Sequence, residues 1–451
     1  MKRAAMWMLG VWSFMVITEG ALRYLFASAG LPLMIYAKDG LLLLVIAWYA
    51  LRIAIHFRIN TTVGLVVAVL VYGVLVALWH RLPAAQVVFG AKIFVTFLVG
   101  YTATATRLID STALRTAFRL GVPLVVLGLA VEMFFDAPWA GFQYEAFGET
   151  LEGSRAWGMS GLPRLAGFGR VNFETANILF CLAALYIAER AARSDRDARI
   201  IRFFDATLLT LGFAGIVATT AKTALLAFLA LTVILAGIGV QRRFRGTSRH
   251  AARAALQFAL AAFGFFACVP PILAAVSPAA VTSLLRTNNL IINILASSYV
   301  ARMERMWPEA LALLNLDHTV LTGRGIGGIG TAQLYFESSK YNAADNMYVY
   351  LTVAFGITIA ALALAWLLWQ ALRHRSEHRA VGYLMVVVVI GLVCGATTNV
   401  IESAALMMTS GIALALWNKS GNPSRAAVCR DFRSTEKFFP ASRDEDLKTG
   451  G

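Results

Sequence analysis

Two arginines in a polar segment have the type and spacing of an anion-binding site. Arg302 and Arg305 are three residues apart, so on a helix they share one face and can act together on a bound anion. An alternative interpretation pairs Arg302 with Glu304, and Arg305 with Glu309, on a solvated surface. A proline follows these arginines and predicts a new helical segment over 308–315.

The same polar segment ends in a carboxylate and an amide. Asp345 and Asn346 directly precede an apolar run and two tyrosines. An Asp in this place commonly caps the following helix, but a carboxylate at a lipid–water boundary can also act as a general base on a hydroxyl group. We predict a catalytic role for Asp345 and a substrate contact for Asn346. Glu402, at the outer end of the last apolar run, is a second candidate carboxylate for substrate binding.

Three further cations stand at the ends of apolar runs. Arg164 and Arg170 flank glycines, and Lys222 follows a hairpin of only a few residues. Glycine lets backbone N–H groups approach a ligand, and arginine binds phosphate with two parallel hydrogen bonds. A cation at membrane depth is costly unless it is paired or functional. Anchoring on lipid phosphates is the alternative; we predict substrate binding for all three.

A glycine-rich segment over 322–330 carries Arg324. It superficially matches a dinucleotide fingerprint, but that motif needs a preceding strand and a βαβ unit of about 30 residues. We reject that match and predict a flexible loop whose backbone, with Arg324, approaches a sugar or a phosphate.

The pattern of metal-ligating residues does not predict a metal site or a cofactor. His80 and His318 are isolated, and the outer segments hold no cluster of His and Cys and no repeated acidic motif. The chain also lacks a nucleotide-binding domain, which excludes an ATP-driven transporter unless a partner chain supplies one.

The composition predicts the kind of fold that must position these residues. Apolar residues make up 59% of the 451 residues and charged residues 14%, whereas about a quarter of a soluble domain is charged. The apolar runs are continuous, which excludes a β-barrel, and a helical span needs about 20 such residues. We predict an all-α, polytopic integral membrane protein of about 12 transmembrane helices, near 5–18, 31–51, 62–80, 84–104, 120–135, 173–189, 203–219, 222–240, 255–276, 346–370, 381–397 and 402–417.

The distribution of positive charge predicts the orientation. If both termini are cytoplasmic, most of the Lys and Arg residues fall in short inner loops and in the C-terminal tail. These loops are expected to contact anionic lipids, which accounts for the net charge of +15 without a nucleic-acid partner. A smaller outer loop over 136–172 and a large one over 277–345 then lie on the non-cytoplasmic side, and the tail over 418–451 is predicted to be disordered and cytoplasmic.

Several short motifs resemble the O-antigen ligase and polymerase superfamily of bacterial envelope glycosyltransferases. The resemblance lies in their order and in their common outer placement. The motifs are Glu19 to Arg23 followed by Lys38-Asp39, Arg164 to Asn172, Thr220 to Thr223, Gly323 to Gly327, Asp345-Asn346 and Gly356.

This resemblance implies a GT-C-like transmembrane domain over 1–417, with an O-antigen ligase-like region over 205–360 and the large periplasmic loop within it. It also implies transfer of a glycan from a polyprenyl-diphosphate-linked oligosaccharide to an acceptor glycan, at the periplasmic face of the inner membrane and without a metal. Arg164, Arg170, Lys222, Arg302 and Arg305 would hold the diphosphate, and Asp345 would orient or deprotonate the acceptor hydroxyl. A flippase and a chain-length regulator are the further partners implied.

Asp345 is also where the chain departs from the ligases, which carry His at this place. The difference favours a polysaccharide polymerase over a ligase that passes glycan to lipid A-core. A non-enzymatic polysaccharide transporter or flippase is the alternative from another class. Secondary transporters show midplane ionisable residues and inverted repeats, and the sequence shows no repeat.

Overall fold

The computed structural model describes residues 2–56, 60–146, 149–155, 157–159, 162–193, 203–243, 247–277, 298–317, 319–373 and 380–420. Part of the large predicted loop (278–297), His318 and nearly all of the predicted tail (421–451) lie outside the described residues. Several arginines of the predicted inner loops, at 194–202 and 374–379, do so as well.

The N-terminal half of the chain forms helices and two small antiparallel hairpins, β1–β2 and β3–β4. The hairpins lie within the predicted smaller outer loop and are a minor departure from an all-α fold. The elements are α1 (Lys2–Ile17), α2 (Glu19–Ser28), the 3-10 helix η1 (Pro32–Tyr36), α3 (Ala37–His56), α4 (Thr61–Trp79), α5 (Ala84–Ala105), α6 (Ser111–Phe134), β1 (Gln143–Ala146), β2 (Glu149–Glu152), β3 (Trp157–Met159), β4 (Leu162–Arg164), α7 (Asn172–Ala192), α9 (Phe203–Ala218) and α10 (Lys222–Arg243).

The C-terminal half is helical, with short 3-10 and π-helical turns between longer helices. The helix expected over 308–315 is α14. The elements are α11 (Thr247–Val276), the π-helix η2 (Arg302–Met306), α14 (Trp307–Asp317), α15 (Thr331–Phe336), η3 (Ser338–Lys340), α16 (Met347–Arg373), α17 (Val381–Val389), the π-helix η4 (Ile390–Cys394), α18 (Gly395–Thr397), η5 (Val400–Glu402) and α19 (Ala404–Ser420).

The predominantly helical, membrane-type architecture is confirmed. Within the described residues, seven helices are long and apolar enough to cross a membrane, or up to nine if each bent pair is one span. Every one of the twelve predicted segments overlaps a helix, but several are too short to pass as spans. The segment expected over 120–135 begins at Ser111, because the side chain of Asp110 caps the N–H groups of Thr112 and Ala113. Helix α19 continues to Ser420, past the predicted end of the transmembrane domain.

Three long helical segments are broken, and the breaks lie near polar groups. Helix α2 leaves α1 at an angle of 87°, and α5 bends by 41° just after Lys92. Helix α16 is interrupted at Gly356, where φ is +84°. Such breaks free backbone groups that need partners when water is absent.

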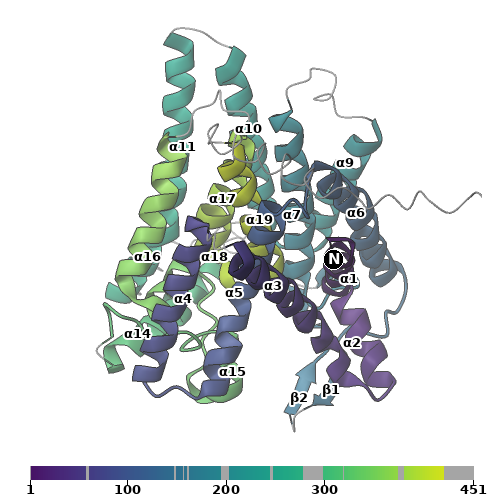
Figure 1. Cartoon of the computed structure of the whole chain (residues 1–451), viewed down its shortest axis with the longest axis vertical. Helices are drawn as coiled ribbons and strands as arrows, with labels where there is room; N and C mark the ends of the chain where they lie inside the picture. Colours follow the sequence, from purple (N-terminus) through teal and green to yellow (C-terminus); the bar gives the residue numbers. More distant parts are fainter. Residues whose placement is uncertain are drawn as a thin grey trace, which may run out of the picture.

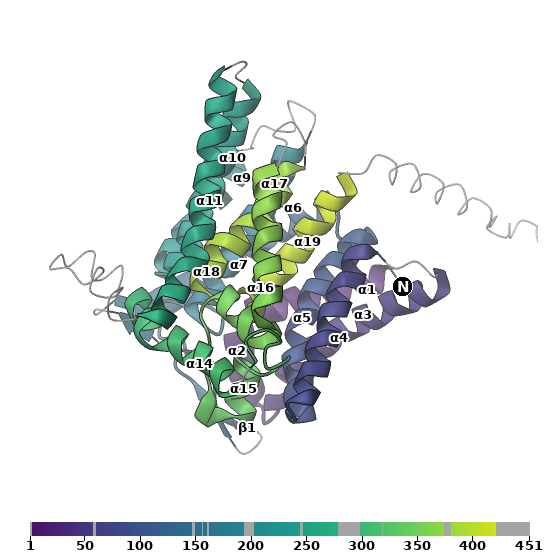
Figure 2. The same ribbon diagram turned by 90° about the vertical axis from the view of Figure 1, so that its left-hand side faces the viewer.

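Described segments of both predicted outer loops lie, together with helix α2, at one end of the molecule. Helices α2, α14 and α15 and the β1–β2 hairpin lie at the bottom of both views (Figures 1 and 2), and we call this the loop end. Helices α10 and α11 extend far toward the opposite end. Residues far apart in the sequence are therefore brought to the same end, as the orientation argument expects.

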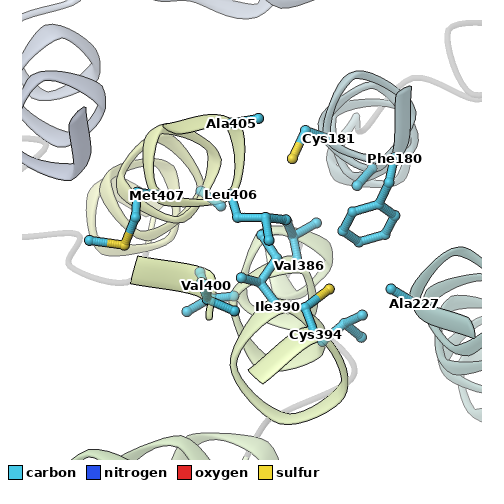
Figure 3. Packing of buried hydrophobic residues seen from close by; sticks show 14 of the residues in the cluster. Phe180, Cys181, Ala227, Val386, Ile390, Cys394, Val400, Ala405, Leu406 and Met407 are labelled. Carbon is cyan, nitrogen blue, oxygen red and sulfur yellow. The ribbon is translucent and has the colours of Figure 1, made fainter. Parts of the chain in front are cut away.

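The core lies where α5, α7, α17 and α19 pack together. Phe180 of α7, Cys394 of η4 and Leu406 of α19 are fully buried and converge in one apolar cluster (Figure 3). Small residues allow the closest approaches: a side chain at Gly100 or Gly411 would collide with backbone carbonyl groups across the α5–α19 interface. This packing mode is typical of helices that associate in lipid.

Candidate functional site

The glycine-rich segment 322–330 is buried and packed, which corrects the prediction of a flexible loop. Its backbone N–H groups bond the broken part of α16 and helix α4: the N–H of Gly325 donates to the carbonyl of Ala354 (2.9 Å) and that of Ile326 to Gly73 (3.0 Å). Gly325 has φ +91°, and a Cβ there would collide with the backbone of Ala77. The glycines therefore serve close helix–loop packing rather than the cradling of a ligand.

The side chain of Arg324 bonds residues of its own loop and of the segment after α15, which gives it a structural role; its substrate contact stays a prediction. Its side chain is only 5% exposed. It donates to the carbonyl of Gly328 (2.9 Å) and to the carboxylate of Glu337 (3.2 Å). Gln86 of α5 donates to the same Glu337 carboxylate (2.9 Å). The arginine thus ties the loop to the segment after α15.

Asn346 is also committed to structure. Its side-chain oxygen accepts from the N–H groups of Tyr348 (2.8 Å) and Val349 (3.1 Å), so it caps α16. Its amide donates to the carbonyls of Ala267 in α11 (3.0 Å) and Ala396 in α18 (2.9 Å). The fully buried side chain holds three helices together and has little capacity left for a substrate. The cap that Asp345 was expected to provide comes from its neighbour.

Asp345 is therefore free of the capping role and is held in a strained backbone. Ala344 and Asp345 have φ values of +62° and +41°, a region that non-glycine residues rarely adopt. Such strain is concentrated at functional sites. The carboxylate is 35% exposed, and its Oδ2 accepts two hydrogen bonds from Arg302, from Nη2 at 3.0 Å and from Nε at 3.2 Å.

Arg302 and Arg305 do not act on one face, which corrects the paired-arginine prediction. They lie in a π-helical turn, a feature that is frequent at functional sites. The wider turn rotates residues three apart away from each other. Arg305 is 83% exposed and pairs with Glu309 at 2.9 Å, as in the alternative interpretation. Only Arg302, which is 19% exposed, faces Asp345.

Lys222 and Arg164 lie near this pair. The positive charges of Arg164 and Arg302 both act on Lys222 at the start of α10. Three cations from β4, α10 and the η2 turn are thus within electrostatic range at the loop end. The hydroxyl groups of Thr223 and Thr397 share a hydrogen bond of 2.7 Å and join α10 to α18 beside them.

The loop 165–170, which connects Arg164 to Arg170, is held by partners on three sides. The carboxylate of Glu132 accepts from the backbone N–H groups of Ala166 (2.7 Å) and Gly167. Trp139 donates to the carbonyl of Gly167 (2.8 Å), and the backbone of α2 donates to the carbonyl of Phe168. The sequence reasoning did not find Glu132, although a lone carboxylate at the end of an apolar helix is a signal for such a role.

Arg170 belongs to a second charged cluster. Its Nε is buried and has no hydrogen bond within the described residues. Its charge acts on Glu19, Tyr36, Glu174 and Tyr341. The charges of Asp345 and Arg170 both act on Tyr341, so this tyrosine lies within electrostatic range of both clusters.

Glu19 forms ion pairs with Arg23 and Lys38, two residues of the motif Glu19 to Arg23 and Lys38-Asp39 for which the sequence predicted no role. Glu19 pairs with Arg23 at 2.7 Å and with Lys38, and Arg23 donates to the hydroxyl of Tyr144 (2.5 Å). Ions at this depth are maintained only when they are paired or functional.

Glu402 is partly buried at the end of η5, within electrostatic range of Asp345. Its carboxylate accepts from the backbone N–H of Thr331 (2.5 Å) at the start of α15. Burial and, to a lesser extent, the charge of Asp345 raise the pKa of Glu402 to about 7, against the opposing effect of the Thr331 hydrogen bonds. The neighbouring Ser403 donates to Glu174 of α7 (3.1 Å). Glu402 can therefore hold a proton near neutral pH.

Burial and the charges of Glu402 and Asp345 also raise the pKa of Tyr341, against the opposing charges of Arg155 and Arg170. Its hydroxyl therefore stays protonated and remains a hydrogen-bond donor. The site therefore combines cations that can bind an anionic group with the carboxylate of Asp345, which Arg302 holds. The hydroxyl of Tyr341 adds a hydrogen-bond donor.

Within the part of the chain that the structure describes, no group of three or more His, Cys, Asp or Glu side chains is placed to hold a metal ion. Comparisons with known proteins add no assignment: no family model, no curated protein and no solved structure matches the chain.

Proposed function

We propose that the protein is an envelope polysaccharide polymerase. It transfers a glycan from a polyprenyl-diphosphate-linked oligosaccharide to an acceptor glycan at the periplasmic face of the bacterial inner membrane. The proposal is carried by one observation: Arg302 holds Asp345 at the loop end, while Arg164 and Lys222, from distant parts of the chain, lie within electrostatic range.

The three cations suit a diphosphate leaving group. Negative charge grows on the diphosphate as its bond to the sugar breaks, and cations fixed beside it stabilise that charge more in the transition state than in the ground state. Arg302 offers the planar fork that binds phosphate oxygens in pairs.

The carboxylate of Asp345 suits the acceptor. In the proposed step, the acceptor hydroxyl oxygen forms a bond to the anomeric carbon of the donor sugar. The bond between that carbon and the diphosphate oxygen breaks, and the electron pair leaves with the diphosphate. The hydroxyl proton passes to Asp345. When Arg302 turns to the phosphate, Asp345 is released to accept from the hydroxyl.

The placement in the membrane belongs to the same proposal. A GT-C-like domain of about twelve spans with both termini in the cytoplasm would put the loop end in the periplasm. The gathering of the outer-loop segments at one end supports this topology. A flippase that delivers the donor and a chain-length regulator are the expected partners.

The test is an in vitro reaction of the purified protein with lipid-linked repeat units. A ladder of products is expected. A single transfer to lipid A-core would assign a ligase, and the absence of any product would favour a transporter.

Binding of farnesyl diphosphate, a short polyprenyl diphosphate, tests the cation cluster separately. Arg302→Ala should weaken binding about tenfold or more, as expected for a lost charge-assisted hydrogen bond. Arg373→Ala is the matched control, because Arg373 stacks on Trp369 (3.6 Å) at the far end of α16. Equal effects of the two substitutions would contradict the site.

A further inference from the structure

Aromatic rings and one ion pair form a cluster that the proposed transfer step does not use. Lys92 of α5 pairs with Asp39 of α3 at 2.7 Å. The Lys92 ammonium group lies 4.7 Å from the ring centroid of Phe89 and 5.7 Å from that of Tyr36. Phe89 in turn packs against Tyr335 of α15, with 5.2 Å between ring centroids. We call these five residues the aromatic cluster.

The ion pair of this cluster is accessible although it lies in apolar helices. Lys92 is 35% exposed and Asp39 is 21% exposed. Lys92 stands at the 41° bend of α5, and eight residues of helix, or roughly 12 Å, separate it from the start of α5 at the loop end. A half-exposed ion pair facing hydrocarbon is costly, so this surface is expected to face water or a polar ligand.

The cluster is connected to the reaction centre by α15. The first residue of α15, Thr331, donates to Glu402, and Tyr335 lies on the same short helix. At about 1.5 Å per residue, these two positions are roughly 6 Å apart along the helix axis. Tyr335 and Tyr341 are 40% and 42% exposed. Exposed aromatic side chains thus lie on α15 and on the segment that leads to Asp345, and the ring of Tyr335 contacts Phe89 beside Lys92.

We propose that the aromatic cluster is a binding subsite for the acceptor glycan. Pyranose rings have an apolar face of C–H groups that packs on aromatic rings, and a rim of hydroxyl groups that both donate and accept hydrogen bonds. The rings of Tyr335, Phe89 and Tyr36 would pack on the apolar face of the sugar. Asp39 would accept hydrogen bonds from its hydroxyl groups, and Lys92 would donate to them. The role as acceptor subsite rests on the proposed function, whereas sugar binding itself does not.

The probe is the oligosaccharide released by mild acid from the lipid-linked glycan of the native cells. This treatment removes the lipid and the diphosphate, so the probe reports the sugar contact alone. The wild-type protein should bind it in detergent. Tyr335→Leu should weaken binding roughly three- to tenfold, the range expected for one aromatic contact. Phe89→Leu, which removes the neighbouring ring, should have a similar effect.

Phe336→Leu is the matched control, because Phe336 is the next residue of the same helix and is equally exposed, at 40%. It should bind the oligosaccharide as the wild type does. Farnesyl diphosphate binding should be unchanged in Tyr335→Leu and reduced in Arg302→Ala. Size-exclusion profiles identical to the wild type confirm that the variants fold.

Three results would overturn the subsite: no binding of the oligosaccharide by the wild type, equal weakening by Tyr335→Leu and Phe336→Leu, or loss of farnesyl diphosphate binding in Tyr335→Leu. The last would assign the cluster to the lipid-linked diphosphate. These results are separate from the fate of the polymerase proposal. If the wild-type protein makes a product ladder but does not bind the free oligosaccharide, the polymerase proposal stands and the subsite proposal is wrong. If it binds the oligosaccharide but makes no product, only the polymerase proposal is wrong.

Discussion

Replacing Asp345 by Asn separates catalysis from stability. The substitution keeps the size of the side chain and an oxygen that can accept from Arg302, but it removes the negative charge. The Arg302–Asp345 pair is partly exposed, at 19% and 35%. Partly exposed pairs contribute about 1 kcal/mol or less, so the thermal midpoint should fall by no more than about 2 °C.

The effect on the reaction should be much larger. A general base contributes about 10²- to 10⁴-fold to the rate, which corresponds to about 3 to 5 kcal/mol in the activation free energy. Asp345→Asn should therefore abolish glycan lengthening while the protein stays folded in the membrane. The assay combines the length distribution of the glycan on a gel with the thermal midpoint of the purified variant.

Glu309→Gln is the matched control for this experiment. It removes the same charge from a neighbouring arginine–carboxylate pair, but that pair is exposed and faces away from the site. Its glycan should have wild-type length. Wild-type glycan length in Asp345→Asn would refute the role of this carboxylate, and so would a loss of activity that accompanies general unfolding.

Three further predictions concern residues that support the site. Gly325→Ala should lower the free energy of unfolding by about 1–3 kcal/mol, because the alanine would be strained at φ +91°. Gly239→Ala is the control, because no atom lies within 4 Å of the added Cβ, and thermal melting in detergent measures both variants. Glu402→Gln should remove a pH dependence: because the folded-state pKa is raised from 4.5 to about 7, the wild type loses stability as pH rises from about 4.5 to 7, and thermal midpoints across that range test it. Glu132→Ala should leave two N–H groups of the loop 165–170 without their acceptor and reduce farnesyl diphosphate affinity about fivefold or more; unchanged affinity would contradict a positioning role.

The helices were predictable because their signal is local. An apolar run of sufficient length predicts a span whatever surrounds it, and each predicted segment overlaps a helix. The start of α6 was missed although Asp110, followed by Ser111 and Thr112, is a recognisable capping sequence. The right-angled turn between α1 and α2 has no comparable signal, because it depends on contacts of α2 with the loop 165–170.

The site was predictable only in part, for reasons that differ between residues. Arg302 was singled out by its spacing from Arg305, and Asp345 because it ends the polar segment directly before an apolar run. Arg305 was wrongly placed beside them, because a π-turn changes which residues share a face and leaves no clear mark in the sequence. Arg324 and Asn346 were assigned to a substrate, yet their hydrogen bonds go to the protein's own backbone and to Glu337. Those partners are distant in the sequence or lie in irregular segments, so the local sequence pattern does not indicate these hydrogen bonds.

The buried glycine-rich loop also has a consequence for the order of assembly during synthesis. Its backbone and that of Gly73 are joined by a hydrogen bond across about 250 residues of chain, and Gln86 reaches the carbonyl of Gly327 over a separation of 241. Contacts of such long range form late and slowly. During synthesis, α4 and α5 are therefore made before their partners, and the Gly73 carbonyl and the Gln86 side chain lack these hydrogen bonds until the loop and α16 have been made. The packing of α4 and α5 is completed only when the segment 322–330 and α16 close against them, so a protein truncated before α16 would lack these contacts.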